Sequence, residues 1–207
     1  MNKMEKGDCM ERMDFLEKGL YSPEYEHDAC GVGLVLHIDG KRSHDIVERG
    51  LQVLENMQHR GAESADNKTG DGAGLMLQIP HEFILLQGIA VPERGTYGTG
   101  LVFFPKEQNE ADACLKIVRE KIEAEGLKLI QVRDVPVNSD ILGEISRSNE
   151  PQIKQIFVTG SFDKQEELEL KLYIVRKKIE KAVSQSSMSQ KKSFYIVSLS
   201  SQRMVYK

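Results

Sequence analysis

The sequence predicts an α+β domain whose sheets are mainly antiparallel. Short apolar runs bounded by Gly or Pro have the character of strands, and between them lie segments whose apolar residues recur at helical spacing. A hairpin-type turn, Asp39-Gly40, follows the first of these runs. Because hairpins mixed with helices are typical of α+β architectures, we expect antiparallel sheets rather than a parallel one.

The first structured elements follow a polar, charged segment that covers residues 1–29. Residues 30–38 (CGVGLVLHI) form a continuous apolar run with glycines, which predicts a buried strand. Beyond the turn, Ser43 is a favourable N-cap for a helix that should end near Gln58. The apolar positions of this helix are Ile46, Val47, Leu51, Leu54 and Met57. A loop rich in Gly and Asp then spans residues 59–74.

Strands and two further helices account for the rest of the chain. Four strands are expected, at residues 75–79, 98–104, 127–137 and 153–160. An apolar stripe over residues 111–122 predicts a helix that ends at Gly126, and Asp163 with Glu166 forms a capping-box pattern for the second helix. Residues 193–206 (SFYIVSLSSQRMVY) are expected to close the chain as a hairpin.

Composition excludes several classes of function. The 207 residues carry a formal net charge of −4, so we expect no nucleic-acid or anionic-lipid partner. No apolar run approaches the roughly 20 residues of a membrane helix, and the charges before residue 30 leave no room for a secretory signal. Three widely spaced cysteines predict neither a disulfide framework nor a metal site and fit a cytoplasmic protein.

Cys30 allows two interpretations when residue type alone is considered. The simpler one is a buried strand cysteine, since free cysteines are usually core residues, as we also expect for Cys114 on its helical stripe. The other is that cleavage of the Ala29–Cys30 bond exposes an α-amine beside the thiol. One residue would then hold both a nucleophile and a general base. Residues 1–29 would be a removable leader.

The string QHRGAE, residues 58–63, contains a second candidate. A lone arginine at a helix end is usually solvated, but Arg60 could instead grip a substrate carboxylate with its planar fork. The nearby TGDGAG string, residues 69–74, lacks the Gly-Lys-Ser/Thr ending of a phosphate-binding loop and precedes a strand instead of following one. A turn packed near the site is therefore the favoured interpretation of TGDGAG.

Three strings in this order resemble the N-terminal glutamine amidotransferase domain of the glutamate synthase large subunit: DACGVGLV, GLQVLENMQHRGAESADNKTGDGAG and FYIVSLSSQRMVYK. The resemblance runs from about Glu26 to Lys207 and implies the αββα sandwich of N-terminal nucleophile hydrolases. It implies that residues 1–29 are a propeptide and residues 30–207 the front part of the domain. Cys30 would attack the glutamine amide to form a glutamyl thioester, and Arg60 with Gly61 would bind the substrate.

The resemblance also implies partners outside these residues. In the family, ammonia released from L-glutamine passes to a synthase domain that converts 2-oxoglutarate to glutamate with FMN, an iron–sulfur cluster and a reductant. We therefore expect no cofactor in this chain and, as partners, L-glutamine and the remaining glutamate synthase domains or subunits.

One motif of the family has no counterpart in this sequence. The family stabilises the oxyanion with an Asn-Gly pair, and no asparagine here precedes a glycine. Because losing one oxyanion donor typically slows catalysis by about 10²–10³, we expect weak or no glutaminase activity. The sandwich is expected to be incomplete at the C-terminus, with an open sheet edge that could support an oligomer. A non-catalytic remnant or assembly module, and another N-terminal nucleophile amidohydrolase, remain the alternatives.

Overall fold

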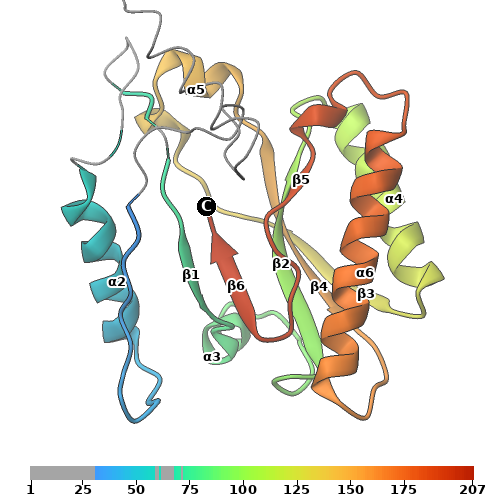
Figure 1. The fold of residues 1–207 in the computed structure, drawn as a ribbon. Helices are drawn as coiled ribbons and strands as arrows, with labels where there is room; N and C mark the ends of the chain where they lie inside the picture. Colours follow the sequence, from blue (N-terminus) through green and yellow to red (C-terminus); the bar gives the residue numbers. More distant parts are fainter. Residues whose placement is uncertain (1–30, 59–60, 62–67, 71) are drawn as a thin grey trace, which may run out of the picture.

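The computed structural model describes residues 31–58, 61, 68–70 and 72–207, and the following account concerns these residues. From left to right, Figure 1 shows α2, a two-stranded sheet, a four-stranded sheet, and α4 with α6. This order of helix, sheet, sheet and helix agrees with the predicted α+β class. In chain order the elements are α2 (His44–Asn56), β1 (Leu75–Gln78), α3 (His81–Leu86), β2 (Tyr97–Phe104), α4 (Gln108–Ala124), β3 (Lys128–Asp134), η3 (Ser139–Ile141), α5 (Glu144–Ser148), β4 (Gln152–Thr159), α6 (Gln165–Ser184), η4 (Lys191–Ser193), β5 (Tyr195–Ile196) and β6 (Arg203–Tyr206).

All strand pairs in both sheets are antiparallel, as the sequence predicted. The larger sheet has the order β3-β4-β2-β5, and the smaller one pairs β1 with β6. The longest register joins β2 to β4, from Tyr97 opposite Thr159 to Phe104 opposite Gln152. Strands β2 and β4 are rich in β-branched and aromatic residues, which fit a pleated surface buried on both faces.

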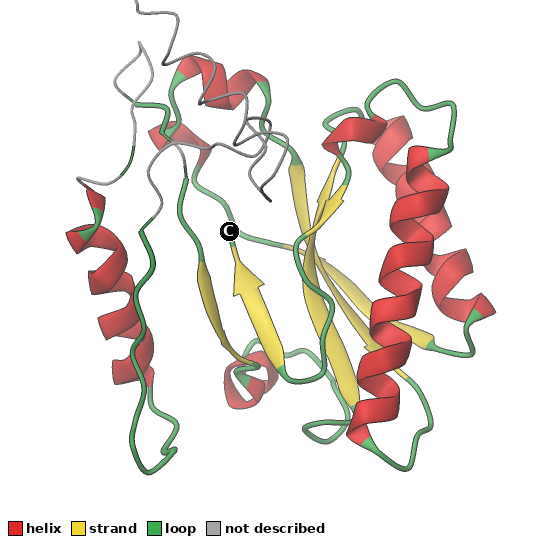
Figure 2. Ribbon diagram, in the orientation of Figure 1, coloured by secondary structure: helices red, strands yellow, loops and turns green. Residues whose placement is uncertain are grey.

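Helices α4 and α6 cover the outer face of the larger sheet (Figure 2). Each helix turns one apolar stripe inward, and the buried residues of these stripes are Ala111, Cys114, Val118 and Ile122 on α4, and Leu168, Leu172, Val175, Ile179 and Val183 on α6. The core position predicted for Cys114 is thus confirmed. The apolar contact between these stripes and the sheet is the main source of burial in this layer.

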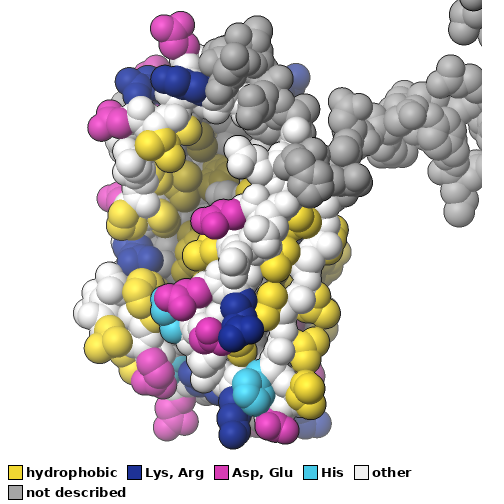
Figure 3. Space-filling view, turned by 90° about the vertical axis from the view of Figure 1, so that its left-hand side faces the viewer, with side chains coloured by type: hydrophobic (Ala, Val, Ile, Leu, Met, Phe, Trp, Pro, Cys, Tyr) yellow, Lys and Arg dark blue, Asp and Glu magenta, His cyan; other side chains and the backbone are white. Residues whose placement is uncertain are grey.

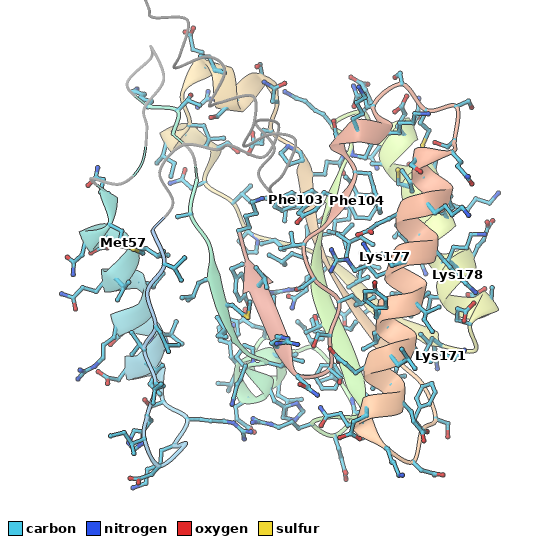
Figure 4. All side chains as sticks on the ribbon, viewed as in Figure 1. Met57, Phe103, Phe104, Lys171, Lys177 and Lys178 are labelled. Atoms are coloured by element: carbon cyan, nitrogen blue, oxygen red, sulfur yellow. The ribbon has the colours of Figure 1, made fainter. Side chains whose placement is uncertain are left out.

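An ionic contact joins the two covering helices. Lys171 Nζ on α6 donates to Glu125 Oε2, at the C-terminal end of α4, over 3.1 Å, and Lys178 donates to the other carboxylate oxygen (Figure 4). These hydrogen bonds hold the pKa of Glu125 below its ordinary value. The helix pair is therefore fixed by charge at its rim as well as by its apolar stripes.

A second core lies between the two sheets. Because side chains alternate along a strand, Phe104 belongs to the core under the helices, whereas Phe103 packs against the core between the sheets (Figure 4). The buried residues of the second core are Ile79, Ile84, Ile89, Tyr97, Leu101, Phe157, Val197 and Met204. Ile79 follows β1, Ile84 belongs to α3 and Met204 belongs to β6, so this core ties the smaller sheet and α3 to the larger sheet.

The predicted strand over residues 30–38 is wrong for its described part. Residues 31–37 join neither sheet, and Val32, Leu34 and Ile38 are 81–94% exposed. Within the described residues, β1 is hydrogen-bonded to β6 alone, and no described strand pairs with residues 31–38. An apolar run without a hydrogen-bonded neighbour stays outside the sheets. The predicted turn is present, since the Gly40 amide donates to the His37 carbonyl over 2.9 Å and Gly40 has a positive φ.

Two further local predictions are wrong. Residues 193–206 do not form a hairpin, because β5 pairs with β2 and β6 pairs with β1, in different sheets. The capping box also fails, since Lys164 occupies the N-cap of α6 and caps it with no side-chain hydrogen bond. Ser43 does occupy the N-cap of α2, although its hydroxyl makes no capping hydrogen bond. None of the described helices is long and apolar enough to cross a bilayer.

The α6 stripe gives a direct test of the core. Replacing the fully buried Leu172 with Ala should lower the free energy of unfolding by about 2–5 kcal/mol, because it removes apolar contacts and leaves a cavity. Leu170→Ala on the same helix is the matched control, since Leu170 is 60% exposed and its loss should cost less than about 0.5 kcal/mol. Urea unfolding measures both, and equal effects would contradict the assigned packing of α6.

Candidate active site

The structure places one of the three sequence-predicted site residues. Cys30 and Arg60 lie outside the described residues, and Gly61 lies within them. Helix α2 ends at Asn56, and the amide of Gly61 donates to the carbonyl of Gln58 over 3.1 Å in the turn that follows. Gly61 is exposed.

The chain that follows Cys30 lies against α2. A Cβ added at Gly33 would overlap Cγ1 of Val53 and lie 3.9 Å from Cε of Met57, which is near the C-terminal end of α2 (Figure 4). Arg42 Nε further donates to Gln78 Oε1 of β1 over 2.8 Å. The close approach that glycine permits at residue 33 thus serves packing on the helix rather than access of a substrate to the backbone.

The described part of the TGDGAG string forms a turn that leads into β1. Gly72 has a φ of +81°, a conformation that residues with a side chain rarely adopt. At Gly74 an added Cβ would lie 2.9 Å from the carbonyl oxygen of Tyr206 in β6. The Thr69 hydroxyl accepts a hydrogen bond from Ser146 of α5 over 3.2 Å. The loop is therefore fixed from two sides, and no helix follows it as a phosphate-binding loop would require.

Two concave regions accompany this arrangement. Figure 3, which shows the face formed by the left side of Figure 1, has hydrophobic side chains gathered in a hollow near its middle. A separate cavity of about 500 Å³ lies between α6 and the smaller sheet, with Met76, Glu169, Tyr173 and Arg203 in its lining. Within this cavity the Ser200 hydroxyl donates to the Glu169 carboxylate over 2.7 Å.

Sequence reasoning missed a polar chain buried between the sheets. Arg133 Nε donates to Gln155 Oε1 over 2.8 Å, and Gln155 Nε2 donates to the Thr99 hydroxyl over 3.0 Å. Gln155 also approaches the sulfur of Met204 at 3.3 Å. The signal was Gln155 itself, a polar residue inside an otherwise apolar strand. Burial raises the pKa of the neighbouring Tyr206 hydroxyl, an effect that the positive charge of Arg133 opposes.

Cys114 has an environment that suppresses thiol chemistry. Burial raises the pKa of its thiol to about 11, and the carboxylate of Glu110 adds to this effect. Its sulfur lies 3.7 Å from the sulfur of Met188. Reactivity requires the thiolate, so Cys114 is a core residue and no second nucleophile. No group of three or more His, Cys, Asp or Glu side chains that could hold a metal ion occurs in the described part of the chain.

Comparison with known proteins places this fold and these motifs in a family. Residues 30–207 match the family described as "Glutamine amidotransferases class-II", and the chain belongs to that family. The resemblance found in the sequence is thereby confirmed. The chain is 42% identical over 194 residues to "Glutamate synthase [NADPH] large chain" of Bacillus subtilis (strain 168), an alignment that covers 92% of this chain and 12% of the relative.

Other relatives carry related names. The "Glutamate synthase [NADPH] large chain" of Azospirillum brasilense is 42% identical over 193 residues, covering 90% of this chain and 12% of the relative. The "Ferredoxin-dependent glutamate synthase 2" of Synechocystis sp. (strain ATCC 27184 / PCC 6803 / Kazusa) is 39% identical over 189 residues. This alignment covers 88% of this chain and 12% of the relative. The chain thus spans about an eighth of the length of these relatives.

Gly61 and Gly74 should differ in their tolerance of a side chain. Gly74→Ala places a methyl group against the Tyr206 carbonyl, so β6 must shift, and we expect a loss of about 1–3 kcal/mol in the free energy of unfolding. Gly61→Ala meets its nearest neighbour at 3.6 Å and should change the free energy of unfolding by less than about 0.5 kcal/mol. Thermal unfolding compares the two, and a neutral Gly74→Ala would contradict the contact between the loop and β6.

Cys114 should resist alkylation in the native chain. With a thiol pKa of about 11, only about one molecule in a thousand carries the thiolate at pH 8, and the side chain is fully buried. Iodoacetamide at pH 8 should leave Cys114 unmodified until urea unfolds the chain, as read by peptide mass spectrometry. Because the unfolded thiol ionises at lower pH than the folded one, the free energy of unfolding should also fall as the pH rises from about 9 to about 11.

Proposed function

We propose that this chain is the glutaminase portion of a glutamate synthase, which releases ammonia from L-glutamine through a thioester on Cys30. The observation that carries the proposal is that the family match begins at Cys30 and extends to residue 207. The first matched residue is a cysteine that becomes a free N-terminus if residues 1–29 are removed. The relatives named glutamate synthase supply the biosynthetic setting.

The proposed reaction needs few groups. The α-amine of Cys30 takes the thiol proton, the sulfur attacks the carboxamide carbon of glutamine, and the proton passes to the leaving nitrogen as the C–N bond breaks. Ammonia departs and a glutamyl thioester remains. Water, deprotonated by the same amine, then adds to the thioester carbon and releases glutamate and the thiol. In each step the α-amine of Cys30 first accepts a proton and then gives it up again. The reaction therefore consumes only glutamine and water.

Substrate binding is assigned to the end of α2. Arg60 would hold the α-carboxylate of glutamine in a bidentate contact, and the backbone of Gly61 would line the same position. The described geometry supports this assignment, because α2 ends at Asn56 and the chain turns at Gly61 with its backbone exposed. The fixed turn at Gly72 and Gly74 then returns the chain to β1.

The partners proposed for the chain follow from this role. They are L-glutamine and the remaining glutamate synthase domains or subunits, which would receive the ammonia and carry FMN and the iron–sulfur cluster. The single cysteine of the described residues, Cys114, is buried and cannot contribute to a cluster site. We place the protein in the cytoplasm, and we assign any self-association to an open sheet edge such as that of β3.

Turnover in these 207 residues should be slow even if the nucleophile is active. The sequence contains no Asn-Gly pair to hold the oxyanion. A non-catalytic remnant would keep Cys30, but its thiol would not react and the chain would not turn over glutamine. The two functions therefore differ in the state of Cys30, which can be read without measuring turnover.

Covalent labelling is the decisive experiment. Intact mass spectrometry of the chain treated with diazo-oxonorleucine, a glutamine-like electrophile, should show loss of residues 1–29 and one adduct on Cys30. Cys30→Ala should abolish the adduct, whereas the matched control Cys9→Ala, which lies in the leader, should keep it. Arg60→Ala should raise the concentration needed for half-maximal labelling by about 10²-fold, because a charged hydrogen-bonding partner of the substrate is lost. A full-length, unlabelled chain would contradict the proposal and favour the remnant.

A further inference from the structure

A small cavity lies between the second half of α6, η4 and β5. Its volume is about 300 Å³, which is at the lower end of the range for pockets that hold a small molecule. Four charged side chains line it, Arg176, Lys177 and Glu180 from α6 and Lys191 from η4, and aromatic side chains come from the chain around β5. The cavity therefore combines charged and apolar surface.

The charged part of the lining is predominantly positive. Arg176 Nε donates to Glu180 Oε1 over 2.9 Å, and Lys177 Nζ donates to Glu180 Oε2 over 2.8 Å. The third cation, Lys191, donates to the Ser186 carbonyl over 2.9 Å. One carboxylate neutralises only one of three cations, so the described lining keeps an excess of two positive charges, although the whole chain carries a formal net charge of −4.

These contacts orient the cations without using all of their donors. A guanidinium has five N–H groups, and within the described chain only the Nε of Arg176 takes part in a hydrogen bond. The side chains of Arg176 and Glu180 are 24% and 26% exposed, so this ion pair is partly shielded from solvent. Lys191 is half-buried and has further N–H groups beyond the one that meets Ser186. Donors held in place in this way lose little freedom when an anion binds.

The apolar part of the lining contains two aromatic rings that are fixed from behind. Phe194 packs edge-on against Phe104 with ring centroids 5.5 Å apart, and the ring of Tyr195 lies 6.2 Å from that of Phe103. Tyr195 is still 42% exposed, and the Lys207 ammonium lies 5.3 Å from the centroid of its ring. A supported ring that remains accessible can stack with a planar group of a ligand.

From this lining we propose that the cavity binds a small phosphate monoester that carries a planar ring. Such a phosphate is close to a dianion at pH 7, which matches the excess of two positive charges. Its oxygens accept hydrogen bonds from Arg176 and the two lysines, while the ring stacks on Tyr195. A monocarboxylate would leave one positive charge unmatched. The proposal is independent of Cys30 and of the proposed glutaminase function.

Titration of the isotope-labelled full chain with AMP, followed by NMR, tests the proposal. AMP should shift the amide signals of Lys177, Lys191 and Tyr195 in a saturable manner. Adenosine and inorganic phosphate should each bind at least about tenfold more weakly, because each keeps only the stacking or only the ionic contacts. Raising NaCl from about 0.05 M to about 0.5 M should weaken AMP binding several-fold, since salt screens exposed charges.

Three variants assign the binding to this cavity. Lys191→Gln should raise the Kd for AMP by about tenfold, because a charged hydrogen-bonding partner is lost. The matched control is Lys192→Gln, whose side chain is exposed and outside the lining, and it should change the Kd by less than about twofold. Tyr195→Leu keeps an apolar contact with Phe103 but removes the stacking ring, and it should also raise the Kd by about tenfold.

Each remaining outcome would overturn the proposal. One is the absence of saturable shifts at the lining residues with AMP up to about 10 mM. Another is an equal effect of Lys191→Gln and Lys192→Gln. Inorganic phosphate that binds as tightly as AMP would contradict the role of the ring, and adenosine that binds as tightly as AMP would contradict the role of the cations.

Discussion

The antiparallel pairing of β2 with β4 is the constraint on which the rest of the structure depends. These two strands share the longest register in the described chain, and their side chains enter both cores. Val102 and Ile156 face the covering helices, while Leu101 and Phe157 face the smaller sheet. Strand β3 adds to β4 and β5 adds to β2, so the order of the larger sheet follows from this pair.

Burial is distributed unevenly between two halves of the molecule. The helices α4 and α6 with the larger sheet contribute most of the buried apolar residues, whereas Gly50 is the single fully buried residue of α2. The positions that we propose for substrate binding, Arg60 and Gly61, follow α2 in the sequence. Local stability follows buried contact, so α2 should open more readily than the layer formed by α4, α6 and the larger sheet.

The local sequence pattern was sufficient to predict a helix or strand where the residues of that element alone determine its structure. The α4 and α6 stripes, the β2 and β4 strands and the ends of α2 followed from spacing, caps and breakers in the sequence. The local pattern failed to predict strand pairing, because pairing depends on segments that are distant in the sequence. Residues 31–38 have a strand-like pattern but no described strand beside them, and β5 and β6 are adjacent in sequence yet belong to different sheets. The contacts of Glu169 were invisible for the same reason, since a carboxylate on a helix does not reveal which loop it meets.

The exposed apolar run over residues 31–38 bears on how chaperones and proteases in a cell recognise the protein. Val32, Leu34, Leu36 and Ile38 alternate along an extended backbone and lie open to solvent, which resembles a nascent or unfolded polypeptide more than a finished surface. Chaperones and proteases continuously sort proteins by exposed features of this kind. An exposed run of this kind adds a feature for such sorting that the buried α4 and α6 layer does not offer.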